Sequence, residues 1–256
     1  MSVATDTQRR RDGLALGPLV LEYHAVSKTW PSGLSVTPAQ LREQLEWLLH
    51  RGYVAGTLSD VAHARAVTAR MLAVTFDDAH LSVLELAYPI LSSLKVPGTV
   101  FPVTAFVENG RPLRWQRSQD WHDTTFAHEL RGMSWAQLAE LAEAGWEIGS
   151  HTQTHPRLTR LTDNELDREL QGSRKACEQA LGRPCQSLAY PFGDADERVA
   201  RHAAAAGYAV AAIEDPGPLD PFLYPRIGIY RQDSMFRFRM KVSPIVRRLR
   251  TMWASR

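Results

Sequence analysis

Short apolar runs of the kind found in strands alternate with amphipathic runs of the kind found in helices along most of this 256-residue chain. In chain order, the expected strands are 18–26, 71–76, 98–103, 146–149, 186–190 and 208–213, and the expected helices are 38–50, 82–94, 134–144, 162–181 and 197–206. Such alternation is typical of βα units around a parallel sheet. Because the units follow one another without a linker, we predict an α/β fold in one domain, a (β/α) barrel of about seven parallel strands.

The alternation also suggests how the rest of the chain is organised. We expect residues 1–17 to form an N-terminal extension, 18–230 the domain, and 231–256 a C-terminal tail. Residues 107–132 form the one long irregular insertion, which contains Trp115 and Trp121. In a compact domain so long a loop is usually a lid or part of a binding wall.

The tail is basic and amphipathic. From Arg231 onward it holds seven arginines and one lysine against a single acid, Asp233, interleaved with apolar residues up to Trp253. This pattern fits a segment that lies on an anionic membrane surface, on the inner face of the membrane. It fits equally well a terminal helix packed on the body with a solvated basic face.

Composition narrows the function classes. The net charge of +2 gives no global attraction to nucleic acid. No apolar run approaches the roughly 18 residues of a membrane span. The arginines at 9–11 precede a stretch interrupted by glycine and proline, which is a poor signal peptide. We therefore expect a cytoplasmic location, with membrane association through the tail as an option, and free thiols at Cys177 and Cys185.

Two adjacent carboxylates, Asp77 and Asp78, directly follow the expected strand 71–76. The carboxyl ends of the strands form the catalytic face of a parallel barrel. Adjacent residues on a strand point to opposite sides, but at a bend into a loop they can converge on one site. One carboxylate could then bind a metal while the other accepts a proton. Taken alone, the pair would also fit a helix cap or a solvated turn.

Two histidines, His151 and His155, follow the expected strand 146–149. Four residues apart on a helical turn, they would share one face and could bind one ion through neutral imidazoles. Two histidines and one aspartate leave a coordination position open for water, as a catalytic zinc site requires. A pair of surface histidines is the alternative, and the neighbouring carboxylate motif weakens it.

Together these motifs resemble those of the polysaccharide deacetylases, carbohydrate esterase family 4, which share the NodB-homology domain. The order and the spacing of some seventy residues are similar, and the likeness extends over about residues 19–229. The resemblance implies a distorted (β/α) barrel, with Asp77 as general base and Asp78, His151 and His155 as ligands of a divalent metal. Zinc is the expected metal, with cobalt, nickel or manganese as alternatives.

A third motif, Tyr190-Pro191-Phe192-Gly193, resembles the variant found in one branch of that family. By this likeness the Phe192 backbone N–H would stabilise an oxyanion, and the rings of Tyr190 and Phe192 would line a sugar pocket next to Pro191. A backbone donor does not depend on the side chain that follows it.

Two departures from the family pattern leave roles to be filled. Ala189 stands where many members have an arginine that orients the base, and we expect Arg226 to supply that cation unless it forms a surface ion pair. No histidine follows His202, so the usual C-terminal general acid is missing. We expect His24, at the end of the first strand, to act as general acid or substrate ligand, unless it only packs at the barrel rim. His80 could compete for that role or orient a metal ligand.

The function expected from these residues is hydrolysis of an N-acetyl group on an amino-sugar saccharide, with release of acetate after Asp77 activates water at the metal. An O-acetyl glycan esterase would use the same site. A catalytically silent glycan-binding homologue is the alternative from another class of protein. The expected location favours a saccharide precursor over a mature cell-wall polymer as substrate.

Overall fold

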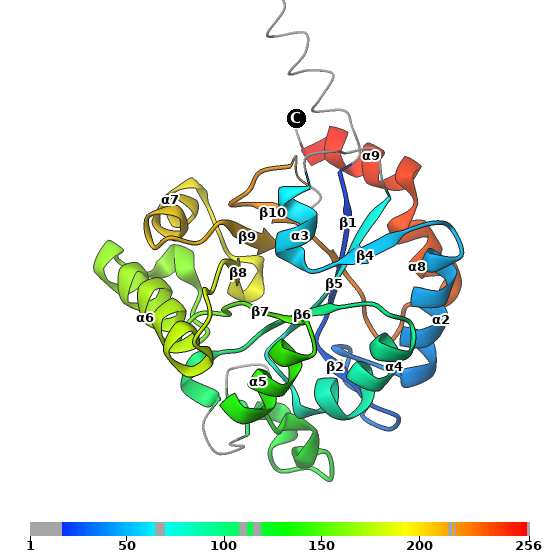
Figure 1. Cartoon of the computed structure of the whole chain (residues 1–256), viewed down its shortest axis with the longest axis horizontal. Helices are drawn as coiled ribbons and strands as arrows, with labels where there is room; N and C mark the ends of the chain where they lie inside the picture. Colours follow the sequence, from blue (N-terminus) through cyan, green and yellow to red (C-terminus); the bar gives the residue numbers. More distant parts are fainter. Residues whose placement is uncertain are drawn as a thin grey trace, which may run out of the picture.

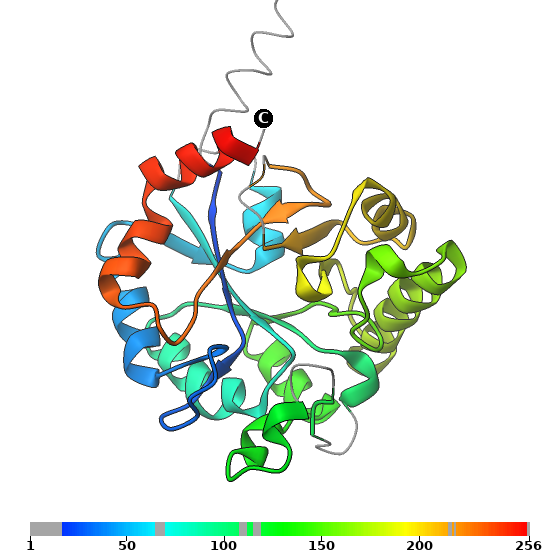
Figure 2. The same ribbon diagram turned by 180° about the vertical axis from the view of Figure 1, so that it is seen from behind.

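Parallel strands occupy the interior of the molecule and helices surround them, as Figures 1 and 2 show from opposite sides. The structure is a computed structural model that describes residues 17–64, 70–107, 112–114, 119–214, 217 and 219–254. Within these ranges every paired strand is parallel to its neighbour. The parallel α/β class predicted from the sequence is therefore confirmed.

The strands are arranged in one large and two smaller sheets. They are β1 (Leu19–Tyr23), β2 (Ala25–Val26), β3 (Ser35–Val36), β4 (Val54–Gly56), β5 (Met71–Asp77), β6 (Gly98–Phe101), β7 (Glu147–Ile148), β8 (Ser187–Ala189), β9 (Val210–Ile213), β10 (Tyr224–Pro225) and β11 (Ile227–Gly228). The large sheet has the order β11-β1-β5-β6-β7, with β4 also paired to β5. The others are β10-β9-β8 and β2-β3.

Two connections link the large sheet to the β10-β9-β8 sheet. An isolated parallel bridge joins Ser150, just after β7, to Leu188 of β8. On the other side only Arg226 separates β10 from β11. Closure of the strands into a barrel stays a prediction, because the hydrogen-bonded pairs of the described residues belong to separate sheets.

Helices cover the outside of the sheets. The α-helices are α2 (Pro38–Leu49), α3 (Leu58–His63), α4 (Tyr88–Ser93), α5 (Trp135–Glu143), α6 (Asp163–Leu181), α7 (Glu197–Ala205), α8 (Met235–Val242) and α9 (Pro244–Ala254). A capping box begins α2, in which the Gln40 N–H donates to the Thr37 hydroxyl and the Thr37 N–H donates to the Gln40 side chain. The main core lies between these helices and the large sheet, where leucines of α2 pack with β1 and β5.

The structure corrects the sequence-based expectation in two of these elements. The expected strand 18–26 breaks at His24 into β1 and β2. The expected helix 82–94 begins with a π-helical turn, η1 (Val83–Ala87), and only then becomes α4. Pro89 has no N–H to donate to the preceding turn, which accounts for the local change of hydrogen-bond pattern. The short elements β3, β4, α3, β10 and β11 were not expected.

The chain after Arg231 forms α8 and α9. Phe238 and Val242 of α8 are buried in the main core, so this helix packs on the body of the protein. Among the described residues, no helix is both long enough and apolar enough to cross a membrane. Cys177 and Cys185 are free, as expected, and both are buried. Of the insertion's two tryptophans, Trp121 ends the 3-10 turn η3 (Gln119–Trp121), and Trp115 lies outside the described residues.

Candidate metal centre

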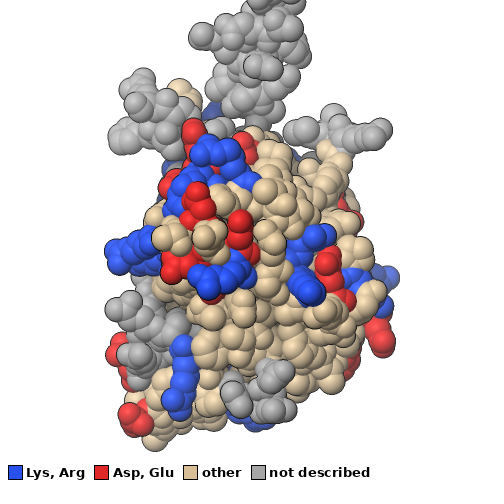
Figure 3. Space-filling model, turned by 90° about the vertical axis from the view of Figure 1, so that its left-hand side faces the viewer, with Lys and Arg blue, Asp and Glu red and all other residues tan. Residues whose placement is uncertain are grey.

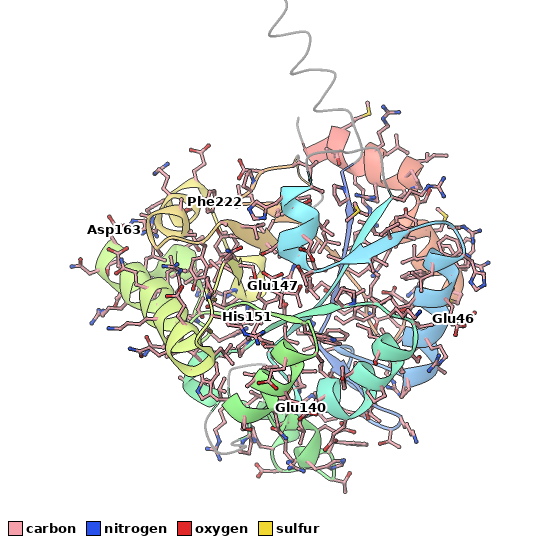
Figure 4. The ribbon with its side chains drawn as sticks, viewed as in Figure 1. Glu46, Glu140, Glu147, His151, Asp163 and Phe222 are labelled. Atoms are coloured by element: carbon pink, nitrogen blue, oxygen red, sulfur yellow. The ribbon has the colours of Figure 1, made fainter. Side chains whose placement is uncertain are left out.

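Asp78, His151 and His155 meet at the carboxyl ends of the strands. Asp78 follows β5, and both histidines follow β7. The Nε2 atoms of His151 and His155 lie 3.6 and 3.7 Å from the same oxygen, Asp78 Oδ1. All three side chains are buried, and His151 lies near the middle of the ribbon, inside the surrounding helices (Figure 4). The structure therefore brings together the three residues predicted to bind a metal.

Unusual backbone conformations concentrate at this centre. Of the six described non-glycine residues with positive φ, five belong to the three sequence motifs. They are Asp78 (70°), Ala79 (52°), Thr152 (67°), His155 (64°) and Phe192 (60°). L-residues adopt this region only at a cost of about 1–3 kcal/mol each, and such strain is typical of functional sites. At Asp78 and Ala79 it forms the bend that lets adjacent carboxylates converge.

The two histidines do not lie on a helical turn, as the sequence suggested. Residues 151–157 form a loop, and left-handed conformations at Thr152 and His155 bring both imidazoles to one side. Glu169 of α6 holds this loop, because its carboxylate accepts hydrogen bonds from the backbone N–H groups of Gln153 (2.8 Å) and Thr154 (2.9 Å). The prediction of a helical turn was wrong, but the convergence it was meant to explain is present.

The donor set fits a divalent transition metal. Among the described side chains, Asp78 Oδ1 is a buried oxygen without a hydrogen-bond partner, and it faces both imidazoles. Ligands about 2.0–2.1 Å from a tetrahedral ion would lie roughly 3.3 Å apart, close to the distances seen here. His151 Nδ1 is 2.8 Å from the Ala189 carbonyl, which can only accept, so Nδ1 carries the hydrogen and Nε2 is left as a ligand atom.

The pKa values of the two histidines and of Asp78 also favour a bound metal. Burial lowers the pKa of His151 and of His155, so both imidazoles are neutral, the form that binds metals. Burial and the neighbouring Asp77 carboxylate raise the pKa of Asp78 well above its usual range. An anion at this position is therefore unfavourable by itself, and a bound cation would offset that cost.

Asp77 belongs to a different arrangement, in which Arg226 takes both of its oxygens. Arg226 Nη1 donates to Asp77 Oδ1 (2.7 Å) and Nη2 to Oδ2 (2.8 Å), and Nη1 also lies 3.1 Å from the Thr75 hydroxyl. Arg226 is only 4% exposed, so this is a buried pair and not a surface one. Burial alone would raise the pKa of Asp77, but the Arg226 charge, with His151, holds it well below its usual range. Asp77 is therefore ionised and oriented.

Glu22, on β1, is a buried residue that the sequence reasoning missed. Its Oε2 lies 3.0 Å from Arg226 Nη2, so the guanidinium bridges two carboxylates. Burial raises the pKa of Glu22 to about 8, an effect that the Arg226 charge only partly offsets. One signal could have revealed it: an acidic residue in the middle of an otherwise apolar strand that is buried along its whole length.

His24 lies next to this pair, at the break between β1 and β2. One ligand atom from each of Glu22, His24 and Asp77 lies within 4.8 Å of the others. Burial lowers the pKa of His24 to about 3, although Asp77 opposes that shift. His80 lies on the other side, with Nε2 3.9 Å from Asp78 Oδ2 and Nδ1 3.1 Å from the Glu129 carbonyl. That placement puts His80 beside a metal ligand, and His24 beside the expected base.

The third motif contributes one residue at the centre and others to the core. The Phe192 ring lies 4.5 Å from the His155 ring, between centroids, and the Arg157 guanidinium covers it at 4.6 Å. Tyr190 is only 1% exposed, and its hydroxyl donates to the Phe222 carbonyl at 2.8 Å. Pro191 is also buried. The Tyr190 ring thus packs in the protein interior, where it offers no exposed wall for a sugar, and the oxyanion role of Phe192 stays a prediction.

A buried carboxylate and two imidazoles with metal-ligand spacing, beside a second carboxylate held by arginine, define a candidate metal-dependent hydrolase site on a parallel α/β fold. Comparison with known proteins supports this interpretation of the site. Residues 64–211, more than half of the chain, match the model of the polysaccharide deacetylase family. The chain belongs to that family.

Two curated relatives show how distant the individual likenesses are. The chain is 23% identical over 202 residues to YxkH of Bacillus subtilis (strain 168), whose name places it provisionally among the polysaccharide deacetylases. It is 25% identical over 171 residues to the poly-β-1,6-N-acetyl-D-glucosamine N-deacetylase of Staphylococcus aureus (strain N315). These alignments cover 77% and 62% of this chain but only 64% and 54% of the relatives. The chain thus spans less than two thirds of the length of either.

Solved structures support the fold. The Streptococcus pyogenes deacetylase PplD, in complex with acetate, superimposes with a TM-score of 0.75 at 20% identity and covers 90% of this chain and 100% of its own. IcaB from Ammonifex degensii gives a TM-score of 0.71 at 19% identity, with coverages of 91% and 97%. At this level of identity the likeness establishes the arrangement of the chain and leaves its chemistry to the residues of the site.

Proposed function

We propose that the protein hydrolyses an N-acetyl group on an amino-sugar saccharide and releases acetate. One observation carries the proposal: three residues with metal-ligand geometry, Asp78, His151 and His155, lie next to Asp77, a carboxylate kept ionised by Arg226. Amide hydrolysis needs both an activated water and a group that takes its proton. The two curated relatives described above carry names from the same class of deacetylases.

The division of work between the residues follows from their contacts. A divalent cation held by Asp78, His151 and His155 would lower the pKa of water to roughly 7 and polarise an acetyl carbonyl. Asp77 takes the proton of the attacking water, and Arg226 keeps its carboxylate deprotonated and fixed in orientation. The Phe192 N–H serves as oxyanion donor in this scheme. We also propose that the chain belongs to the family branch with the Tyr-Pro-Phe-Gly motif. Zinc and a cytoplasmic location remain predictions.

His24 is our candidate for the group that returns a proton to the leaving nitrogen. Its pKa of about 3 means that it is neutral in the resting enzyme, so it must first receive a proton, and Asp77 is its neighbour. We expect His24→Gln to lower kcat on an N-acetyl substrate by about 10²-fold. An acetyl ester with a good leaving group needs no such proton, so its hydrolysis should be nearly unchanged. Equal losses on both substrates would instead give His24 a packing or binding role.

A direct assay tests the function as a whole. Acetate release should be measured over N-acetylglucosamine, its oligosaccharides, nucleotide sugars, lipid-linked sugars and O-acetylated glycans, with and without a chelator. We expect release from at least one class, lost with chelator and restored by zinc, cobalt, nickel or manganese. Release only from O-acetylated glycans would favour the esterase alternative. Saccharide binding without any release of acetate would favour a catalytically silent homologue.

A further inference from the structure

The outward face of α9 is apolar, which is unusual for a helix that packs on the body of a protein. Ile245, Leu249 and Met252 are 73%, 52% and 47% exposed. Their spacing of four and three residues places them on one side of the helix. The opposite side meets the body, where Arg247 Nη2 donates to the carbonyls of Gly17 (2.8 Å) and Pro18 (2.7 Å). A surface helix normally turns its apolar stripe toward the core, and α9 does the reverse.

Helix α8 extends this surface. Its buried side chains, Phe238 and Val242, anchor it in the main core, while Phe236 and Met240 remain exposed. Five of the seven exposed large hydrophobic residues in the described part of the chain therefore lie on α8 and α9. We call the five residues the α8–α9 patch: Phe236, Met240, Ile245, Leu249 and Met252. So dense a set of exposed apolar side chains indicates an interaction surface.

The charged side chains of α8 and α9 have one sign. Between Met235 and Met252 the sequence contains five arginines and one lysine and no acidic residue. Arg237, Arg248 and Arg250 are exposed among the apolar side chains. The side of the molecule formed by α6 and α7 is different, because acidic and basic side chains are interspersed there (Figure 3). The α6–α7 side of the molecule thus does not share the basic character of α8 and α9.

We propose that the α8–α9 patch is a membrane-binding surface that recognises anionic phospholipid. Large apolar side chains interleaved with arginines are the pattern that inserts at the boundary of headgroups and acyl chains while the cations contact lipid phosphates. A second copy of the chain fits less well, because it would bring two basic patches into contact. The proposal does not depend on the deacetylase activity.

The position of α9 relates the patch to the candidate site. Gly17 and Pro18, which accept the hydrogen bonds of Arg247, directly precede β1. Figures 1 and 2 both place α9 beside the start of β1. The metal-ligand residues lie at the opposite, carboxyl ends of the strands. The α9 part of the patch and the candidate site therefore lie at opposite ends of the strands.

Vesicle sedimentation tests the proposal on the full chain. We expect binding to phosphatidylcholine vesicles that contain phosphatidylglycerol, weak binding to phosphatidylcholine alone, and a marked loss of binding at high salt. Ile245→Ser with Leu249→Ser should lower the partition coefficient at least about tenfold, because it removes the two most exposed aliphatic anchors of α9. Arg237→Glu with Arg250→Glu should lower it by a similar factor.

The matched control is Val54→Ser, which removes a comparably exposed apolar side chain (57%) from β4. It should bind vesicles like the parent, and circular dichroism should show that all variants are folded. Absence of binding by the parent, binding indifferent to phosphatidylglycerol, or equal losses in Val54→Ser would overturn the proposal. So would a dimer of the parent in light scattering that the Ile245→Ser, Leu249→Ser variant dissociates, because the patch would then join two copies of the chain.

Discussion

Two clusters of carboxylates and imidazoles lie beside each other at the carboxyl ends of the strands, and only one is suited to a metal. In one, the donor atoms of Asp78, His151 and His155 lie within 4.8 Å of one another. In the other, Glu22, His24 and Asp77 meet the same criterion. Residue types and spacing alone would make both candidate metal sites.

The difference between the clusters is Arg226. Its guanidinium occupies both oxygens of Asp77 and contacts Glu22, so the second cluster already contains its cation. The carboxylate of the first cluster instead faces two imidazoles that burial keeps neutral. A buried carboxylate needs a positive charge nearby, and a fixed arginine or a bound metal can each supply it. The comparison thus supports the proposal that the first cluster binds a metal and the second transfers protons.

Removal of one ligand from the first cluster should have the largest effect. His151→Ala leaves two of three ligands, so we expect metal content to fall far below one ion per chain and acetate release to fall to the background of the assay. Mass spectrometry of the purified protein measures the metal content, and the acetate assay measures the activity. A variant that kept a full equivalent of metal would show that the ion lies elsewhere, with the second cluster as the next candidate.

Asp77→Asn changes the second cluster, and it should lower catalysis without changing metal binding. The amide keeps the shape of the carboxylate but cannot take a proton, so kcat should fall by about 10²–10⁴-fold. Metal content should stay at the level of the parent, which makes this variant the matched control for His151→Ala. Full activity, or loss of the metal, would break the division of roles between the two clusters.

Arg226→Met should act on stability and on the pH profile. Removal of one partner from a buried ion pair typically costs about 3–5 kcal/mol, which urea unfolding would measure. Because Arg226 holds the pKa of Asp77 below its usual range, its loss should raise that pKa. The base would then be protonated at a higher pH, so the acidic limb of kcat/KM should move upward. A smaller stability loss when the substitution is made in Asp77→Asn would confirm the pairing.

The sequence predicted the parts of the site that are adjacent in the chain better than those that the fold assembles. Asp77, Asp78, His151 and His155 were visible because each motif directly follows an apolar run. Arg226 could be proposed as the missing cation, but its bidentate contact depends on β10 and β11, which are too short for periodicity to reveal.

Physical reasons explain why the sequence did not predict some residues or predicted them in the wrong place. The loop of His151 and His155 relies on left-handed backbone at non-glycine residues, which residue type does not signal. Tyr190 was expected at the sugar pocket, yet its hydroxyl is satisfied by the Phe222 carbonyl within the core. Glu22 was overlooked because an acid within a strand resembles a solvent-facing residue until the strand is known to be buried on both faces.

Glu22→Gln should have the smallest effect on activity and the most specific effect on stability. The folded protein keeps the Glu22 proton up to about pH 8, whereas the unfolded chain loses it near the ordinary pKa of 4.5. The folded state binds more protons between these values, so Glu22 makes stability fall as the pH rises through that range. Glutamine cannot titrate, so the variant should lose less stability than the parent between about pH 5 and about pH 8 in urea unfolding.

Glutamine keeps a side-chain oxygen that can lie against the Arg226 guanidinium, so the Glu22→Gln variant should retain activity within about tenfold of the parent. Equal pH slopes for the two proteins would mean that Glu22 is ionised in the folded state. Arg226 would then face two full negative charges and offset only one of them, so the second cluster would carry a net charge of −1 before substrate binds. That outcome would weaken the contrast between the clusters, because the second would also attract a metal.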